Sequence, residues 1–138
     1  MPAFTVTEQT TLPPDQAWAR LVDWPQHAAH VPLTTIAVRS GAPGLGAGFV
    51  ARTGLGRFGF DDPMEIVTWD PPHFCRIEKR GRVMLGWAEL SVRPAGSGSV
   101  VTWTEEAVPA RLPRFARPAA DAAGRRLFTR VLRGLLSG

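Results

Sequence analysis

The sequence predicts an α+β fold in which a curved antiparallel sheet of seven strands surrounds one long C-terminal helix, with two short helices after the first strand. Apolar and polar residues alternate from about residue 34 to 107 between short turns, and apolar residues recur at helical spacing from 119 to 136. The chain has 138 residues, of which 44% are hydrophobic and 20% charged. We therefore expect one domain spanning residues 1–138, with a core that needs neither disulfides nor metal.

The first strand and the two short helices are predicted from the N-terminal 32 residues. Residues 4–10 are rich in β-branched side chains, as strands are. Prolines and an acid in Leu12-Pro-Pro-Asp15 favour a helix start, and apolar residues then follow at helical spacing. That helix should end near Trp24-Pro25. A second one is expected from Gln26 to His30, before Pro32.

Six further strands are predicted where apolar residues alternate, at about 34–40, 47–54, 57–69, 73–80, 82–93 and 99–107. Short Gly- and Pro-containing segments separate them, among them Gly54-Leu-Gly56 and Arg80-Gly81. Because each break is short, neighbouring strands should pair as antiparallel hairpins. Asp62-Pro63 interrupts the longest strand, where we expect a bulge.

Residues 119–136 carry the strongest helical pattern, after a Pro- and Arg-rich connection at 109–118. One broad face of this helix is predicted to be apolar and to pack on the sheet. It contains Ala120, Ala123, Leu127, Phe128, Val131 and Leu135. The opposite face carries an arginine stripe, which we define as Arg126, Arg130 and Arg133.

Several local motifs, in this order of elements, resemble a known family. They are Leu12-Pro-Pro-Asp-Gln-Ala-Trp18, Val22-Asp-Trp-Pro25, Gly44-Leu-Gly-Ala-Gly-Phe49, Trp69-Asp-Pro-Pro72, the turn at Gly81-Arg-Val83, and Val101-Thr-Trp-Thr-Glu-Glu106. The chain resembles the helix-grip fold of the START-like (SRPBCC) superfamily, and more narrowly the polyketide cyclase/dehydrase and lipid-transport family. The match spans nearly the whole chain, but its motifs are structural rather than catalytic.

The resemblance implies a cavity between the curved sheet and the long helix that binds an apolar small molecule. A few members of the family catalyse cyclisation or dehydration of polyketides. No cofactor and no metal are implied. Alternation along the strands, with the apolar helix face, predicts which side chains line the cavity: Phe49, Ala51, Phe60, Met64, Ile66, Met84, Gly86, Ala88, Trp103, Glu105, Leu127 and Val131. Gly86 and Ala88 are small and would leave room for a ligand.

Polar candidates inside this cavity are few. Adjacent side chains on a strand point to opposite faces, so Glu105 and Glu106 cannot form a carboxylate dyad. Glu105 faces the core if Trp103 does, and burial would raise its pKa. In a helix-grip fold the short helices close one end of the cavity, which would place His30 near the mouth. Glu105 and His30 are therefore the candidate proton carriers, and Arg52 is a further candidate polar contact.

Three other patterns have simpler structural explanations. Gly54-Leu-Gly56-Arg-Phe-Gly59 matches a nucleotide-binding motif, but strand rather than helix follows it. His27 and His30 have metal-ligand spacing but no evident third ligand. The only cysteine, Cys75, lies in a strand pattern and is expected to be a buried thiol.

Net charge is +4 and is unevenly distributed, because the segment from Arg111 onward has seven arginines and one acid. A solvated helix face is the simplest explanation; docking to an acidic protein, an anionic membrane or nucleic acid is the alternative. The stripe has no aromatic residues among its charges, so no specific nucleic-acid partner is expected. A single cysteine and the absence of a signal-peptide pattern or an apolar membrane span predict a cytoplasmic protein.

Three functions follow from these patterns. The first is binding of a hydrophobic small molecule, such as a lipid, an aromatic compound or a polyketide-like molecule. The second is a polyketide cyclase or dehydratase that uses Glu105 and His30. The third is an interaction module with a filled core, whose functional surface is the arginine stripe. The sequence also leaves room for a homodimer.

Overall fold

A computed structural model of the chain describes residues 3–31, 33–38, 45–54 and 59–137. Within them, seven strands form one antiparallel sheet in the spatial order β1-β7-β6-β5-β4-β3-β2. The strands are β1 (Phe4–Thr10), β2 (Thr34–Val38), β3 (Gly48–Thr53), β4 (Phe60–Asp70), β5 (Phe74–Lys79), β6 (Met84–Ala95) and β7 (Gly98–Pro109). The predicted sheet of antiparallel neighbours is thereby confirmed.

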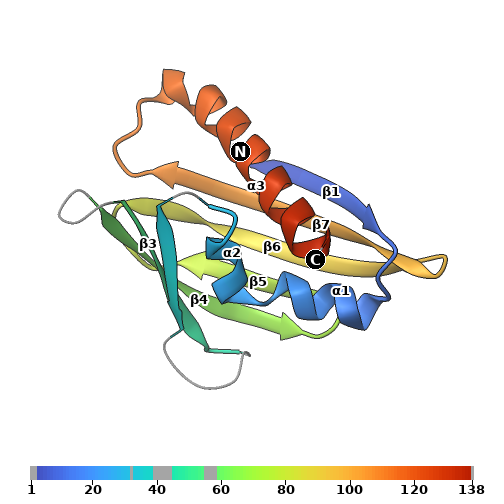
Figure 1. Cartoon of the computed structure of the whole chain (residues 1–138). Coiled ribbons are helices and arrows are strands. Elements are labelled where there is room, and N and C mark those ends of the chain that lie inside the picture. Colours follow the sequence, from blue (N-terminus) through green and yellow to red (C-terminus); the bar gives the residue numbers. More distant parts are fainter. Residues whose placement is uncertain (1–2, 32, 39–44, 55–58, 138) are drawn as a thin grey trace.

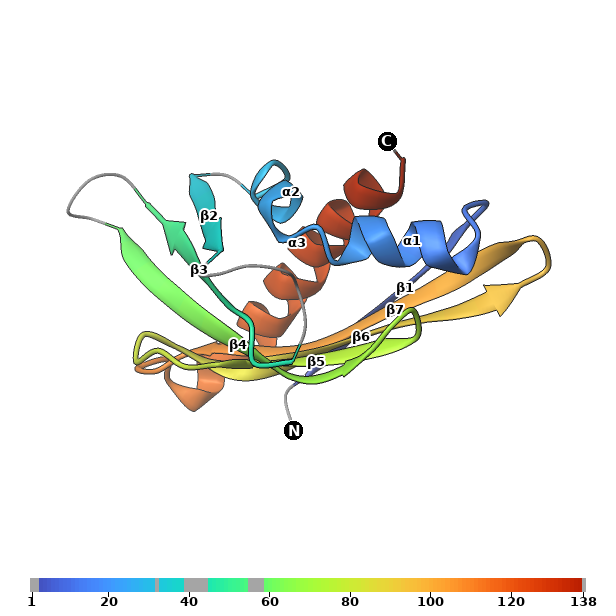
Figure 2. The same ribbon diagram turned by 90° about the horizontal axis from the view of Figure 1, so that it is seen from below.

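Three α-helices lie on the concave side of this sheet, which curls up around them (Figures 1 and 2). They are α1 (Pro14–Leu21), α2 (Trp24–Ala28) and α3 (Arg117–Ser137), the last preceded by a 3₁₀ turn (Arg114–Ala116). The long C-terminal helix is thus confirmed, two residues earlier at its start than the pattern indicated. The second helix begins at Trp24 because Pro25 fits the first turn of a helix, where its missing N–H costs no hydrogen bond.

The core lies where α3 and α1 cover the β1–β7–β6 part of the sheet. Fully buried side chains from the helices and the sheet meet there, including Leu21, Leu90, Val101 and Leu132. Phe4 of β1 stacks on Phe128 of α3 with ring centroids 5.8 Å apart. The helix can approach this closely because residue 124 is glycine: a Cβ there would lie 2.7 Å from the Phe4 ring.

The apolar face of α3 differs in part from the prediction. Val131 and Leu135 are buried as expected, but Ala123 is exposed, and Leu132 and Leu136 are buried as well. The reason is that α1 also contacts α3, so the C-terminal half of the helix is covered on two sides rather than one.

The predicted bulge at Asp62-Pro63 is wrong. Pairing between β3 and β4 runs without interruption through Val50↔Pro63, and the register irregularity lies between Ile66 and Thr68. The carbonyl of Pro63 accepts the Arg80 N–H at 2.7 Å, beyond the end of β5. The nitrogen of Pro63, which has no hydrogen to donate, faces the same side as this carbonyl. Because β5 has already ended there, the proline removes no hydrogen bond between β4 and β5. The predicted turn at 54–56 and the glycine motif at 54–59 lie largely outside the described residues.

Gly86 gives a direct test of the sheet geometry. Its φ is +136°, and a Cβ there would lie 1.7 Å from the Glu106 carbonyl oxygen of the neighbouring strand. We expect Gly86→Ala to lower the free energy of unfolding by at least about 3 kcal/mol, measured by urea denaturation.

Gly96→Ala is the matched control, since Gly96 also has a positive φ (+60°) but nothing lies near its Cβ position. The free energy of unfolding of this variant should fall by only about 1 kcal/mol. Equal losses in the two variants would show that the close approach of β7 to Gly86 does not matter.

Candidate functional site

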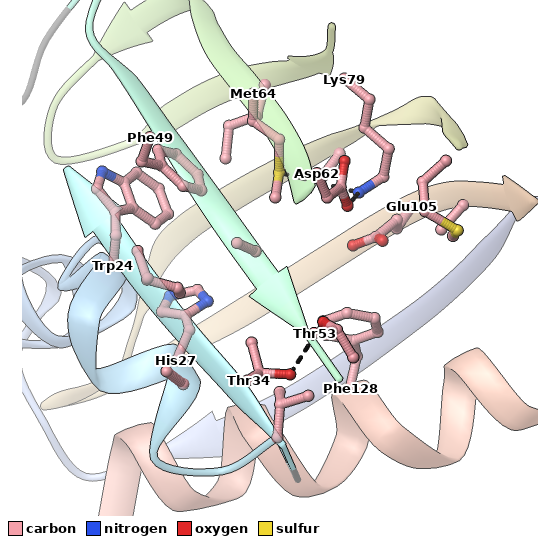
Figure 3. Close-up of a pocket in the computed structure, with 18 of the residues that line it drawn as sticks. Trp24, His27, Thr34, Phe49, Thr53, Asp62, Met64, Lys79, Glu105 and Phe128 are labelled. Carbon is pink, nitrogen blue, oxygen red and sulfur yellow. Dashed lines mark hydrogen bonds and ion pairs between the residues drawn. The ribbon is translucent and has the colours of Figure 1, made fainter. Parts of the chain in front are cut away.

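A cavity of about 250 Å³ lies between the concave face of the sheet and helices α2 and α3 (Figure 3). Most of its wall is apolar. Side chains of β3, β4, β6 and β7 form the floor, α2 contributes one side, and Leu127 and Phe128 of α3 contribute another. The sheet therefore supplies both the core and the cavity, at different places along the same concave face.

Most of the residues predicted to line a cavity do lie in this wall. They are Phe49, Ala51, Phe60, Met64, Met84, Ala88, Trp103, Glu105 and Leu127. Strand alternation placed them there, because one face of each strand points toward the helices.

Ile66, Gly86 and Val131 do not line the cavity. Ile66 and Val131 have no exposed surface and belong to the packed core. At Gly86 the space that a side chain would occupy is filled by the backbone of β7. Alternation predicts from which face of the sheet a side chain points. It does not predict where along the concave face the side chain lies, and that position decides whether the residue belongs to the core or to the cavity wall.

A row of aromatic rings forms the most rigid part of the wall. Trp24 of α2 stacks on Phe49 of β3 with centroids 4.9 Å apart and planes 15° from parallel. His27 lies between Trp24 and Trp103, at 5.2 Å and 5.3 Å, and Trp103 contacts Phe128 at 4.9 Å. The row joins β3, α2, β7 and α3, so these elements hold one another apart at a fixed spacing.

Ionisable groups gather at the opposite end of the cavity from α2 (Figure 3). Lys79 of β5 forms an ion pair with Asp62 of β4 at 2.7 Å, with only 8% and 10% of their side-chain surfaces exposed. The Lys79 Nζ also lies 3.8 Å from the Met64 sulfur. Asp62 Oδ1 is buried and has no hydrogen-bond partner among the described residues. Such an unsatisfied acceptor costs about 1–3 kcal/mol.

Glu105 of β7 completes this group of ionisable side chains. It is 4% exposed, and Trp103 Nε1 donates a hydrogen bond to its Oε1 at 2.8 Å. Burial raises the pKa of Glu105; the charge of Lys79 and the Trp103 hydrogen bond oppose this only in part. The carboxyl therefore holds its proton to higher pH than an ordinary glutamate and can act as a hydrogen-bond donor.

His27, not His30, is the histidine in the cavity wall. Its Nε2 lies 2.8 Å from the Leu21 carbonyl oxygen, and burial lowers its pKa to about 4. The ring is therefore neutral at pH 7, Nε2 donates to the carbonyl, and Nδ1 keeps its lone pair as an acceptor.

His30 lies outside the cavity, in a separate groove on the far side of α2 where its ring packs against Gly134. The prediction of His30 near the mouth is therefore wrong. Helix α2 ends at Ala28, so helical spacing does not relate the two histidines.

The other candidate side chains also lie away from the cavity. Arg52 is largely exposed and forms an ion pair with Asp61 at 3.0 Å. Cys75 is fully buried in the core, which raises its pKa to about 12. Among the described residues, no group of three His, Cys, Asp or Glu side chains could hold a metal ion. In the same part of the chain, no helix is long and apolar enough to cross a membrane.

The sequence analysis missed Asp62, Lys79, Trp24 and His27 as neighbours of one cavity. A signal for two of them was present. Asp62 has the same strand parity as Met64, and Lys79, the only lysine, has the same parity as Ile77. No local sequence pattern predicts that Trp24 and His27 line the cavity, because α2 is positioned by its tertiary contacts with β2 and α3.

Comparisons with known proteins agree with this architecture. Residues 1–137 match a family described as polyketide cyclase / dehydrase and lipid transport. The fold is similar to that of TTHA0849 from Thermus thermophilus (TM-score 0.78, 15% identity, 97% of this chain and 94% of that one). It is also similar to the Zhui aromatase/cyclase from Streptomyces sp. R1128 (0.75, 14%, 97% and 90%) and to Ara h 8.0201 (0.70, 15%, 99% and 98%). No curated protein matches the sequence significantly. At these identities the structural likeness establishes the helix-grip fold and not an activity.

The burial of His27 predicts a pH dependence of stability. Its pKa is about 4 when folded and about 6.5 when unfolded, so the unfolded chain binds the proton more tightly. The contribution of His27 to the free energy of unfolding is therefore fully present above pH 6.5, and it is lost as the pH is lowered toward 4. When the pH is lowered from 7 to 4, the free energy of unfolding should fall by about 3 kcal/mol more in the wild-type protein than in the His27→Gln variant, as measured by urea denaturation.

His73→Gln is the control, because His73 is exposed. This variant should lose as much stability on acidification as the wild-type protein. If His27→Gln follows the wild-type pH dependence, His27 is not buried as a neutral ring.

Proposed function

The chain belongs to the polyketide cyclase/dehydrase and lipid-transport family, and from this premise we propose that it binds a hydrophobic small molecule between the sheet and α3. The observation that carries the proposal is the mostly apolar cavity, in which the ion pair of Asp62 and Lys79 lies with Glu105 at one end. We also propose that residues 1–138 act as one domain.

Size and wall chemistry favour a compact ring compound. A volume of about 250 Å³ is near the lower limit of small-molecule pockets, which span roughly 300–1,000 Å³. Flat aromatic surfaces of Trp24, Phe49 and Trp103 suit a planar ligand. Burial of its apolar surface would contribute about 25 cal/mol per Å² before the costs of association.

The polar end would orient such a ligand. Asp62 Oδ1 is an acceptor without a partner among the described residues, and burial raises the pKa of Glu105, which favours the protonated form that can donate. A hydroxyl on the ligand would satisfy the buried carboxylate oxygen, and a carbonyl would accept from Glu105. We therefore propose that the ligand carries oxygen substituents at one end and is otherwise apolar.

The open cavity does not support the interaction module that requires a filled core. One member of the arginine stripe is also already bound within the molecule, since Arg133 donates a hydrogen bond to Glu8 at 3.2 Å. The single, buried Cys75 supports a reducing compartment such as the cytoplasm.

Filling the cavity tests the binding proposal. We expect 2-naphthol to quench the emission of the cavity tryptophans in a saturable manner. Ala51→Phe should weaken this binding by at least about tenfold, because the added ring occupies the ligand volume.

Ala37→Phe is the matched control, since it adds the same ring at an exposed position of the neighbouring strand β2. Its binding should equal that of the wild-type protein. Absence of saturable quenching in the folded wild-type protein, or equal binding by both variants, would contradict the proposal.

A second candidate function is dehydration of a β-hydroxy ketone. The observation that favours it is Glu105, a buried carboxyl with a raised pKa in the cavity wall. Such a carboxyl can donate its proton to a leaving hydroxyl and release water. We assign removal of the α-hydrogen to Asp62, whose buried Oδ1 has no hydrogen-bond partner among the described residues.

Turnover separates this candidate from simple binding. With 4-hydroxy-4-phenyl-2-butanone as probe, conversion to the conjugated enone is followed by absorbance. Glu105→Gln should lower the rate by about 100-fold or more and change binding little. Glu106→Gln, on the opposite face of β7, should leave the rate unchanged. Equal turnover by wild-type protein and Glu105→Gln would exclude Glu105 as the proton donor.

A further inference from the structure

One end of the molecule carries exposed apolar side chains within a basic surface. We call it the tip, and it consists of residues 81–85, which comprise most of the β5–β6 turn and the start of β6, and residues 109–117, which connect β7 to α3. The Ala110 N–H donates to the Val83 carbonyl at 2.8 Å, and Leu85 pairs with Val108. Figures 1 and 2 place both segments at the same end of the sheet, at the N-terminus of α3.

Apolar surface at the tip is unusually exposed. Phe115 in the 3₁₀ turn is 87% exposed, more than any other large hydrophobic residue that the structure describes. Val83 of the β5–β6 turn and Leu85 at the start of β6 are each 46% exposed. Exposed apolar side chains on two segments at the same end of the molecule are unfavourable in water and become buried when a partner binds.

The charge around this apolar surface is positive and not neutralised. Arg111, Arg114 and Arg117 lie in a stretch from 107 to 120 that contains no acid, and Arg82 adds a fourth charge. Within the described residues none of the four has an ion pair, whereas Arg76 of β5 and Arg80, directly after β5, are paired with carboxylates. The flanking acids, Glu106 and Asp121, are both half-buried.

We propose that the tip docks on an anionic lipid bilayer. Arginine side chains would contact lipid phosphates while Phe115, Val83 and Leu85 enter the headgroup region. A bilayer fits better than a nucleic acid, because aliphatic side chains bury in acyl chains but provide no stacking surface for bases, and the tip has a single aromatic ring.

The position of the tip connects docking with the cavity, a step that rests on the proposed function. Met84 and Ala107 belong to the cavity wall; Met84 is itself a tip residue, and Ala107 lies two residues before Pro109, where the tip begins on β7. A docked protein would therefore hold this end of the cavity near the bilayer surface, where a membrane-dissolved ring compound could enter.

Vesicle flotation tests the docking. Wild-type protein should float with phosphatidylcholine vesicles that contain about a third phosphatidylglycerol, and not with pure phosphatidylcholine vesicles. Binding should weaken at about 0.5 M salt, because the phosphate contacts are screened. Arg111→Gln combined with Arg114→Gln should weaken binding roughly 25-fold, and Phe115→Ala about tenfold.

The control removes the same charge from the other end of the molecule. Helix α1 and the β6–β7 turn lie at the opposite end of the molecule from the tip (Figure 1). Arg20 belongs to α1 and Arg93 to the last residues of β6. Arg20→Gln with Arg93→Gln should therefore weaken binding less than about threefold. A loss equal to that of the tip variants would overturn the assignment to the tip. Unchanged flotation of Phe115→Ala would overturn the apolar contact.

Two further measurements complete the test. If wild-type protein leaves anionic vesicles unbound but binds a fluorescent oligonucleotide through Arg111 and Arg114, the bilayer proposal is wrong. Tip variants should bind 2-naphthol as the wild-type protein does, since none of the changed residues lines the cavity. Loss of docking with intact 2-naphthol binding thus separates this proposal from the proposed function.

Discussion

The ion pair between Asp62 and Lys79, buried beside Glu105 under the concave face of the sheet, is the constraint on which the site depends. Ionised side chains inside an apolar wall cost several kcal/mol each unless they are paired. The register of β3, β4 and β5 sets this pairing, because Met64 lies opposite Lys79 and Asp62 opposite Ala51. If apolar side chains of α3 packed directly against these ionisable groups, they would exclude the remaining water from them and raise the cost of desolvation. A space between helix and sheet is the arrangement that avoids this cost.

The aromatic row keeps that space open from the other side. Rings of Phe49, Trp24, His27, Trp103 and Phe128 contact one another in sequence and join elements that are distant in the chain. Small residues then leave the volume empty between the row and the ionisable groups; they are Ala51, Ala88 and Ala107. An apolar wall with charge at one end and aromatic rings at the other binds molecules of the same asymmetry, which links the packing of the fold to the proposed ligand.

Much of the fold could be predicted from the sequence, because alternation and turn residues act locally. Strands, hairpin pairing and α3 are in that class, and alternation placed Phe49, Met64 and Glu105 in the cavity wall. Errors arose where tertiary contacts decide. Position along the sheet separates cavity residues from Ile66, the backbone of β7 fills the space at Gly86, and the end of α2 turns His30 outward. The partnership of Asp62 with Lys79 spans two strands, and no local pattern reports such a pair.

Methyl NMR of the methionines tests the central claim, a cavity that binds ring compounds, most directly. Met64 and Met84 both line the wall and report from two different strands. In protein labelled at the methionine methyl groups, titration with 2-naphthol should shift both signals along one saturable curve. In Ala51→Phe the shifts should be lost or require a much higher concentration. Unchanged Met64 and Met84 signals, or shifts that never saturate, would contradict a ligand site between the sheet and α3.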